Sequence, residues 1–337
     1  MIRGLSAFEK RLCNTLQNGL PIRRRPFAQI AKTLRSTENE VLKRTRGLVN
    51  RGVIRRLGVV VNWRALGKVS TLVAAHIEQG DLQKIIKAVN KLEGVSHNYL
   101  RGHHYNLWFT LRADSQKQIS TILKKLSRRF GSAFHSLPVI RPFKLDVRFD
   151  AESEGRRLLA SDDTPAKDLP GQEGQMTDDG RRTISKIDEE ILKGLEGGLK
   201  VVSRPFDFIS GSAKLTTGDN EFEIADGLLH IEEMIEEGVI SRLGAIVNHH
   251  KLGFVANAMF VCKAKKSRAI KLGEKLAAID IVSHCYERRI FRKWPYNLYA
   301  MMHGRSLADI RRAAEKFVRE EGIEKWELLE TEEKLKK

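Results

Sequence analysis

Residues 52–67 read GVIRRLGVVVNWRALG, and residues 238–253 read GVISRLGAIVNHHKLG. The likeness between the two stretches continues in both directions along the chain. The further matches are RPF at 25–27 and 204–206, VSHNYLR at 95–101 with VSHCYER at 282–288, and YNL at 105–107 and 296–298. A likeness that recurs in the same order over most of the chain indicates a tandem duplication.

Each copy predicts a helical head followed by a body of mixed helices and strands, so the fold class expected is α+β. The boundaries that follow are a winged helix-turn-helix head at 1–67, a ferredoxin-like body at 68–150, a linker at 151–182, a second head at 183–253 and a second body at 254–337. The linker is rich in Gly, Asp, Ser and Pro and lacks apolar periodicity. Two such bodies in one chain can pair as a built-in pseudo-dimer.

Helical spacing in the first head predicts a helix at 6–18, a short helix at PFAQIAKTL and a third helix at ENEVLKRTRGLVNR that ends at Gly52. The stretch VIRRLGVVVN then predicts a β-hairpin with Gly58 near its bend, which completes a winged helix. The body reads strand, helix, strand, strand, helix, strand, the βαββαβ order of a ferredoxin-like unit. The second copy repeats this order from Phe254 onward.

Composition bounds the class of protein. Apolar residues make up 41% of the 337 residues, which is ordinary for a globular protein, and no apolar run is long enough for a membrane helix or a secretory signal. We therefore expect a cytoplasmic protein without a membrane contact. The cysteines Cys13, Cys262 and Cys285 form no CxxC pair, so neither a disulfide framework nor a thiolate metal site is predicted.

The charge distribution argues against two-handed DNA binding. Residues 1–150 carry 29 Lys and Arg against 9 Asp and Glu, and the third helix of the first head bears Lys43, Arg44, Arg46 and Arg51. Residues 219–237, in the second head, carry eight acids and no Lys or Arg. Phosphate would repel that helix, so a paired grip on DNA is not expected, although one-handed binding by the first head stays open.

Chemistry is indicated by a motif on the first inner strand of each body. Alternation along a strand puts His97, Tyr99 and Arg101 on one face, and the second copy repeats them as His284, Tyr286 and Arg288. In each copy, a proton donor, a hydroxyl and a cation therefore lie on the same face of a strand. Further aromatic, cationic and amide side chains follow the motif in the sequence. They are His103, His104, Tyr105, Asn106 and Trp108 in the first copy, and Arg289, Arg292, Trp294, Tyr296, Asn297 and His303 in the second.

Flat rings beside guanidinium groups suit a flat ligand with several carboxylates, because the rings stack and the guanidinium groups bind carboxylates in pairs. At these residues the chain resembles the siroheme decarboxylases, including the NirD- and NirL-type proteins of heme d1 biosynthesis, with two subunits fused. The heads alone also resemble the leucine-responsive and asparagine-type (Lrp/AsnC) regulators. The resemblance implies that the enzyme removes the C12 and C18 acetate carboxyl groups of siroheme to give 12,18-didecarboxysiroheme, with no added organic cofactor.

Within that reading, we expect His97, His104 or His284 to supply a proton and Tyr99 and Tyr286 to position or donate. The substrate-binding set is Arg101, His103, Tyr105, Asn106, Trp108, Arg288, Arg289, Arg292, Trp294, Tyr296, Asn297 and His303. No protein metal site is expected, although a histidine could bind the iron of siroheme axially. Further copies of the chain and other heme d1 pathway enzymes are the expected protein partners. Two alternatives stay open: a ligand-responsive DNA-binding regulator and a tetrapyrrole-binding protein without turnover.

Overall fold

The computed structural model describes residues 4–145, 148–152, 184–209 and 224–336. Except for residues 151 and 152, the predicted linker lies outside these residues. The described chain forms two compact units, one made of the two heads and the other of the two bodies. The fold is mixed α/β, as the sequence predicts.

The head unit contains residues 4–67, 148–152, 184–209 and 224–253. Its elements are α1 (Ala7–Asn18), α2 (Pro26–Thr33), α3 (Glu38–Asn50), β1 (Ile54–Val61), α6 (Lys186–Gly197), α7 (Ile224–Glu236), β6 (Ile240–Val247) and the short 3-10 helix η1 (His249–Leu252). The three helices predicted for the first head are confirmed. Helix α1 begins at a reciprocal cap, in which Ser6 Oγ accepts from the Glu9 amide and Glu9 accepts from the Ser6 amide.

The predicted hairpin after α3 is wrong. Residues 54–61 form one strand, β1, which pairs antiparallel with β6 of the other head and sets Gly58 opposite Gly244. A Cβ atom at Gly58 would lie 2.6 Å from the Leu195 carbonyl oxygen of α6, and one at Gly244 would lie 2.5 Å from that of Leu16 in α1. These glycines therefore permit a helix to approach the strand closely and do not make a turn.

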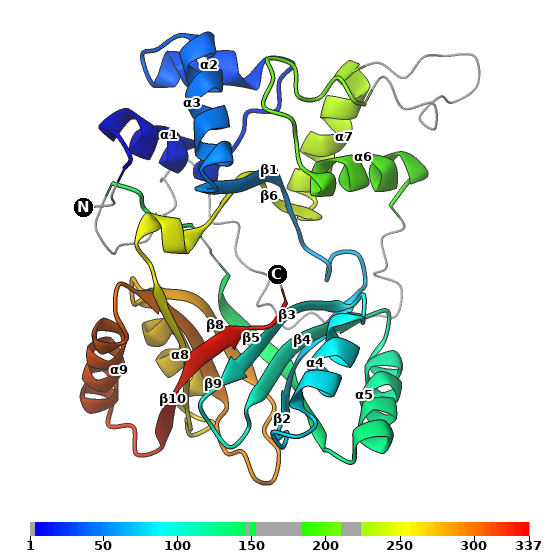
Figure 1. Cartoon of the computed structure of the whole chain (residues 1–337), viewed down its shortest axis with the longest axis vertical. Coiled ribbons are helices and arrows are strands. Elements are labelled where there is room, and N and C mark those ends of the chain that lie inside the picture. The colour runs from blue at the N-terminus through cyan, green and yellow to red at the C-terminus, as the bar shows by residue number, and fades with distance from the viewer. Residues whose placement is uncertain (1–3, 146–147, 153–183, 210–223, 337) are drawn as a thin grey trace. The chain divides into compact units, whose positions relative to one another are not determined.

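The body unit contains residues 68–145 and 254–336. Its elements are β2 (Val69–Ala75), α4 (Leu82–Asn90), β3 (Val95–Arg101), β4 (Leu107–Ala113), α5 (Gln116–Phe130), β5 (Phe134–Leu145), β7 (Ala256–Cys262), α8 (Ala269–Ala278), β8 (Val282–Arg288), β9 (Leu298–Gly304), α9 (Leu307–Glu321) and β10 (Trp326–Lys334). Both bodies show the predicted order of strands and helices. Figure 1 shows the four helices on the outside of the strands.

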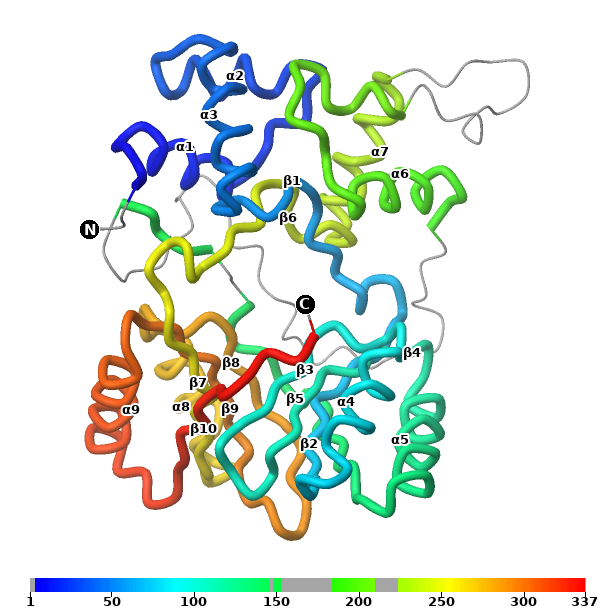
Figure 2. The backbone as a smooth tube through the Cα atoms, viewed as in Figure 1, coloured from blue at the N-terminus to red at the C-terminus, as the bar shows by residue number. Residues whose placement is uncertain are grey.

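The eight strands close into a barrel in the order β10-β3-β4-β2-β5-β8-β9-β7. Closure depends on the last strand of each body, because β5 pairs with β2 of its own body and with β8 of the other, while β10 pairs with β7 and with β3 (Figure 2). The far end of β5 packs over α8, where the ring of Phe143 would lie 2.2 Å from a Cβ atom at Gly273. Each body thus completes the sheet of the other.

Three apolar clusters follow from this arrangement. Two lie between the strands of a body and its helices, with Ile85 and Leu123 in the first and Leu272 and Phe317 in the second. The third contains no helix residue and joins both bodies, for example through Trp108 and Trp294. Because the helices cover the outer face of the strands, the third cluster occupies the inside of the barrel.

Among the described helices none is both long and apolar enough to cross a membrane. All three cysteines are buried and free, as the sequence predicts.

Candidate active site

The repeated histidine, tyrosine and arginine lie in a row on each of two barrel strands. On β3 the rings of His97 and Tyr99 are 6.2 Å apart, and the Arg101 guanidinium carbon lies 5.4 Å from the Tyr99 ring. On β8 the rings of His284 and Tyr286 are also 6.2 Å apart, and the Arg288 guanidinium carbon lies 4.6 Å from the Tyr286 ring. These contacts confirm that each set shares a face. We call His97, Tyr99 and Arg101 the first ladder, and His284, Tyr286 and Arg288 the second ladder.

The arginine of each ladder is buried inside the barrel, with 3% of Arg101 and 7% of Arg288 exposed. Arg101 crosses the interior to β9, where its Nη2 lies 3.9 Å from Met301 Sδ, and its Nη1 donates to the carbonyl of Leu329 and the hydroxyl of Thr331, both at 2.9 Å. Arg288 Nη1 donates to the Leu137 carbonyl at 2.9 Å. The Nε atoms of both arginines are buried without a hydrogen-bond partner.

Neither buried guanidinium is paired with a carboxylate anywhere in the described chain. Burial lowers the pKa of both arginines, that of Arg101 to about 10. Arginine side chains keep their charge at neutral pH in proteins. A buried cation without a counter-ion costs several kcal/mol, a penalty that an arriving anion would relieve. The barrel interior is therefore suited to an anionic ligand.

The histidine of each ladder is held by the serine that precedes it. His97 Nδ1 lies 3.0 Å from Ser96 Oγ, and His284 Nδ1 lies 2.9 Å from Ser283 Oγ. Ser96 and Ser283 were not among the predicted site residues, although the repeated VSH was a signal that could have identified them. The hydrogen bond fixes the orientation of each imidazole ring.

His303, which the sequence places among the substrate-binding residues, lies behind Ser283 in the structure. Its Nε2 is 3.0 Å from Ser283 Oγ, and only 7% of the residue is exposed. The first body has no such ring at this place, because Ser96 Oγ contacts the Thr110 hydroxyl at 2.8 Å.

Four of the predicted aromatic residues pack into one aromatic cluster inside the barrel, together with Tyr299, which was not predicted. Its members are Tyr105, Trp108, Trp294, Tyr296 and Tyr299. The rings of Trp108 and Trp294 are 5.4 Å apart, and their indole groups donate to the Tyr105 carbonyl and the Tyr299 hydroxyl. Trp294 and Tyr296 come from the longer loop of the second body, so the extra residues of that loop fill the barrel beside the arginines. The aromatic cluster is a rigid wall whose indole donors are satisfied.

Polar contacts fix this wall in place. Tyr296 donates to Glu327 at 2.6 Å, and His103 Nε2 lies 2.9 Å from the other oxygen of the same carboxylate. Burial, together with the hydrogen bond to Glu327, raises the pKa of Tyr296. Asn106 exchanges two hydrogen bonds with the backbone of Ile77, and Asn297 does the same with Ala264. These contacts engage the very amide groups that were predicted to bind substrate, which indicates a structural use for both asparagines.

Three predicted residues lie away from the barrel interior. His104 is exposed in the turn after β3, at the opposite end of that strand from His97, and its ring stacks on His76 at 4.2 Å. Arg289 and Arg292 are exposed in the loop after β8. The structure therefore does not bring these residues together with the ladders.

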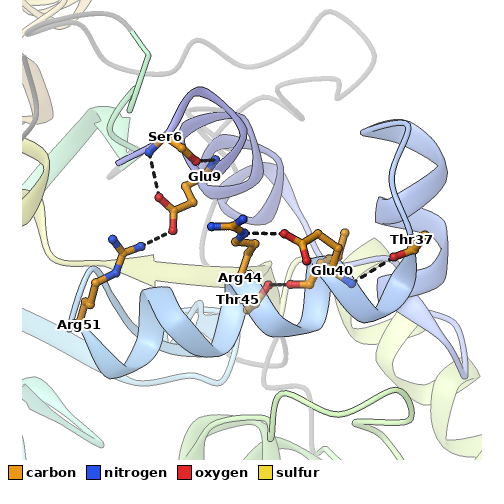
Figure 3. Close-up of polar contacts among 8 residues, drawn as sticks. Ser6, Glu9, Thr37, Glu40, Arg44, Thr45 and Arg51 are labelled. Carbon is orange, nitrogen blue, oxygen red and sulfur yellow. Dashed lines mark hydrogen bonds and ion pairs between the residues drawn. The ribbon is translucent and has the colours of Figure 1, made fainter. Parts of the chain in front are cut away.

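Most cations of α3 have partners within the head unit. Arg44 pairs with Glu40, and Arg51 pairs with Glu9 at the start of α1 (Figure 3). Arg46 donates to the Val201 carbonyl at 2.9 Å, whereas Lys43 has no ion pair or side-chain hydrogen bond within the described ranges of the chain. No cluster of three or more metal-binding side chains occurs among the described residues.

A duplicated α/β barrel whose two buried arginines have no carboxylate partner among the described residues is suited to an anionic ligand. Comparison with known proteins narrows this class. Residues 65–144 and 251–336 match the AsnC-like ligand binding domain, and residues 9–55 match the siroheme decarboxylase NirDL-like HTH domain.

The chain is 31% identical to a siroheme decarboxylase of Hydrogenobacter thermophilus over 98% of its own length and 93% of that protein. It is similar, with 26% identity and a TM-score of 0.71 over 98% of this chain and 93% of the other, to the siroheme decarboxylase NirDL crystallised in complex with an iron-uroporphyrin III analogue. The alpha subunit of the Desulfovibrio desulfuricans siroheme decarboxylase is 38% identical over 44% of this chain and 87% of that subunit. The chain belongs to the siroheme decarboxylase family, whose members are carboxy-lyases.

Proposed function

We propose that this chain decarboxylates siroheme inside the body barrel, removing the C12 and C18 acetate carboxyl groups to give 12,18-didecarboxysiroheme. The observation that carries the proposal is the pair of buried guanidinium groups without carboxylate partners. Siroheme is a flat, iron-bearing ring with several carboxylates, so it offers the anions that the two arginines lack and a flat face that can stack on the aromatic cluster. The crystallised relative was solved with an iron-uroporphyrin III analogue, which is a molecule of the same kind.

The ladders supply groups for each chemical step. Arg101 and Arg288 bind carboxylates of the substrate, and the aromatic cluster excludes water beside them. Breaking the bond between the acetate methylene and its carboxyl carbon releases CO₂ and leaves the electron pair on the methylene, where the adjacent ring delocalises it. His97 or His284 then gives a proton to that carbon, while Tyr99 and Tyr286 position the side chain.

The proposal extends to the parts of the molecule that frame this site. Each copy is taken as a winged helix-turn-helix head fused to a ferredoxin-like body, although residues 210–223 of the second head lie outside the described chain. The reaction needs no organic cofactor, and a ladder histidine is the candidate axial ligand of the substrate iron. The product serves heme d1 or an alternative heme pathway in the cytoplasm, where other pathway enzymes and further copies of this chain are candidate partners.

Anaerobic incubation of the protein with siroheme, followed by mass analysis of the tetrapyrrole, tests this function. We expect two successive losses of CO₂ and a product that carries two methyl groups in place of two acetates. An unchanged mass with bound siroheme would favour a tetrapyrrole-binding protein without turnover. Salt-sensitive binding of the protein to a specific DNA sequence would favour a regulator.

The ladder histidines can be tested one at a time. Replacing His97 or His284 with Ala should leave siroheme bound, since the arginines and the aromatic cluster remain. At least one of the two variants should lose most of its decarboxylation rate, because general acid catalysis typically contributes about 100-fold or more. Wild-type rates in both variants would remove these histidines as proton donors.

A further inference from the structure

We infer that the two ladders have different functions and that the second ladder supplies the proton that replaces CO₂ on the substrate. In this ladder His284 is the proton donor, and His303 acts through Ser283 to orient His284 and to replace its proton. This inference rests on the proposed function, and it assigns His303 as a positioning residue. Three differences between the halves carry it.

The first difference is what stands behind the serine. In the second body, Ser283 Oγ is 2.9 Å from His284 Nδ1 and 3.0 Å from His303 Nε2, so one hydroxyl contacts two imidazoles. The same hydroxyl also lies within donating distance, 3.2 Å, of the Met301 carbonyl oxygen. In the first body, Ser96 Oγ is 3.0 Å from His97 Nδ1 and 2.8 Å from Thr110 Oγ1. A threonine hydroxyl does not bind a proton near neutral pH, whereas an imidazole does. Through its serine, the second ladder is therefore joined to a titratable group, whereas the serine of the first ladder contacts a threonine.

The second difference is exposure to water. Ser283 is fully buried and His284 is half-buried, whereas Ser96 and His97 are both exposed. Hydrogen bonds are stronger in a buried, low-dielectric place, and a proton moving along them is not lost to bulk water. The chain from His303 to His284 thus lies where a defined proton path can exist.

The third difference is the number of donors left on each arginine. Arg101 uses Nη1 for two hydrogen bonds and directs Nη2 at Met301, while Arg288 makes one side-chain hydrogen bond, to the Leu137 carbonyl. Arg288 therefore has more N–H groups available to a carboxylate. The cation best prepared to orient a reacting carboxylate stands on the same strand as His284.

The proton transfer balances along this chain. When CO₂ leaves, the electron pair of the broken carbon–carbon bond stays with the methylene and the conjugated ring. His284 gives its Nε2 proton to the methylene carbon, Nδ1 takes the Ser283 hydroxyl proton, and Ser283 takes the Nε2 proton of a protonated His303. The outcome is a methyl group, a neutral His284, an intact serine and a neutral His303. For the second acetate, His284 Nε2 takes a proton from solvent, and the Nδ1 and hydroxyl protons move back along the chain, which returns the charge to His303 and leaves the new Nε2 proton on His284.

The duplication supplies a matched pair of variants for the test. We would compare Ser283→Ala with Ser96→Ala in single-turnover decarboxylation of siroheme across a pH series, with siroheme binding followed by absorbance. Ser283→Ala should slow decarboxylation by about tenfold or more, and Ser96→Ala by less than about threefold, while both bind siroheme nearly as tightly as the wild type. Ser283→Thr keeps the hydroxyl and should restore most of the rate, which separates the hydroxyl from a general packing effect.

A second variant, His303→Gln, addresses the titrating group. It can still donate a hydrogen bond to Ser283 but cannot be protonated, so the limb of the pH–rate profile that reports on this ring should disappear and the rate should fall. In ¹⁵N-histidine spectra of the ligand-free protein, the titration of His284 should change in His303→Gln and Ser283→Ala and stay as in the wild type in Ser96→Ala. Equal slowing by the two alanine variants, or a wild-type rate and pH profile in His303→Gln, would overturn the inference. Either result would leave the two losses of CO₂, and hence the proposed function, intact.

Discussion

We expect the buried charge of Arg288 to make the ligand-free protein less stable than an apolar side chain at this position would. A buried charge without a counter-ion is often replaced by an apolar side chain with a gain in stability. We therefore expect Arg288→Met to raise the free energy of unfolding of the ligand-free protein by about 1 kcal/mol. The same variant should weaken siroheme binding by about tenfold or more, because a charge-assisted carboxylate contact is lost. Urea unfolding and an absorbance titration with siroheme measure the two effects.

Arg101→Met is the matched control for that prediction. Arg101 Nη1 donates to the Leu329 carbonyl on a buried residue and to Thr331, so its removal leaves buried acceptors without donors. Its gain in stability should therefore be smaller than that of Arg288→Met, or should become a loss. The prediction would be contradicted if the ligand-free Arg288→Met protein were less stable than the wild type and bound siroheme equally well. Arg288 would then neither destabilise the ligand-free protein nor bind a substrate carboxylate.

Individual residues also show how far sequence reasoning reaches. The ladders could be predicted, because alternation along a strand fixes which side chains share a face. The pairing of His103 with Glu327 and of Ser283 with His303 could not, because each joins segments whose contact depends on loop paths and strand register. The same limit explains Asn106, whose pattern beside a motif suggested substrate contact and whose amide instead holds the backbone of Ile77.

At the scale of elements, the start of α1 is tied to the end of α3 by Glu9 and Arg51 (Figure 3). Burial raises the pKa of Glu9, but the hydrogen bond from the Ser6 amide and the charge of Arg51 outweigh it and hold that pKa below the ordinary value of 4.5. A carboxyl with a lowered folded-state pKa stabilises the fold above the unfolded pKa, and this stability is lost as pH falls through the folded value. Glu9→Gln should thus cost about 2 kcal/mol at neutral pH, and progressively less as pH falls below the ordinary pKa of 4.5.

Glu40→Gln is the control for Glu9→Gln. Glu40 also pairs with an arginine of α3, but both side chains of that pair are more than a third exposed. An exposed pair within one helix contributes about 0.5 kcal/mol or less, so this variant should unfold close to the wild type at every pH. Urea unfolding at several pH values gives both results, and equal losses in the two variants would show that burial of Glu9 plays no special part.

The helices and strands of the first head show where a local sequence pattern predicts structure correctly and where it does not. Helix spacing and caps predicted α1, α2 and α3 well, because those signals are local. The glycine of VIRRLGVVVN reads locally as a turn, yet β1 finds its partner in β6, in a segment that follows the whole first body. Only a long-range pairing explains why Gly58 is a point of close approach for α6.

At the scale of the whole molecule, the two copies are joined by strands as well as by the linker. Heads pair through β1 and β6, and bodies pair through β5 with β8 and β10 with β3. The repeat in the sequence predicted two bodies, and it allowed their sheets to meet at faces or at edges. The exchange of last strands at both edges depends on the full length of β5 and β10, which propensity at their ends does not fix.

This exchange predicts that the linker is not what holds the copies together. A protease site placed within residues 153–183 and cut after purification should leave one species with the mass of the uncut protein in size-exclusion chromatography with light scattering. That species should still decarboxylate siroheme, because both ladders and the aromatic cluster stay in one barrel. The half-length alpha subunit among the relatives matches a single copy of this chain, as such an arrangement would allow. Elution of two separate fragments in native buffer would contradict it, because each fragment would then tolerate open sheet edges at β3, β5, β8 and β10.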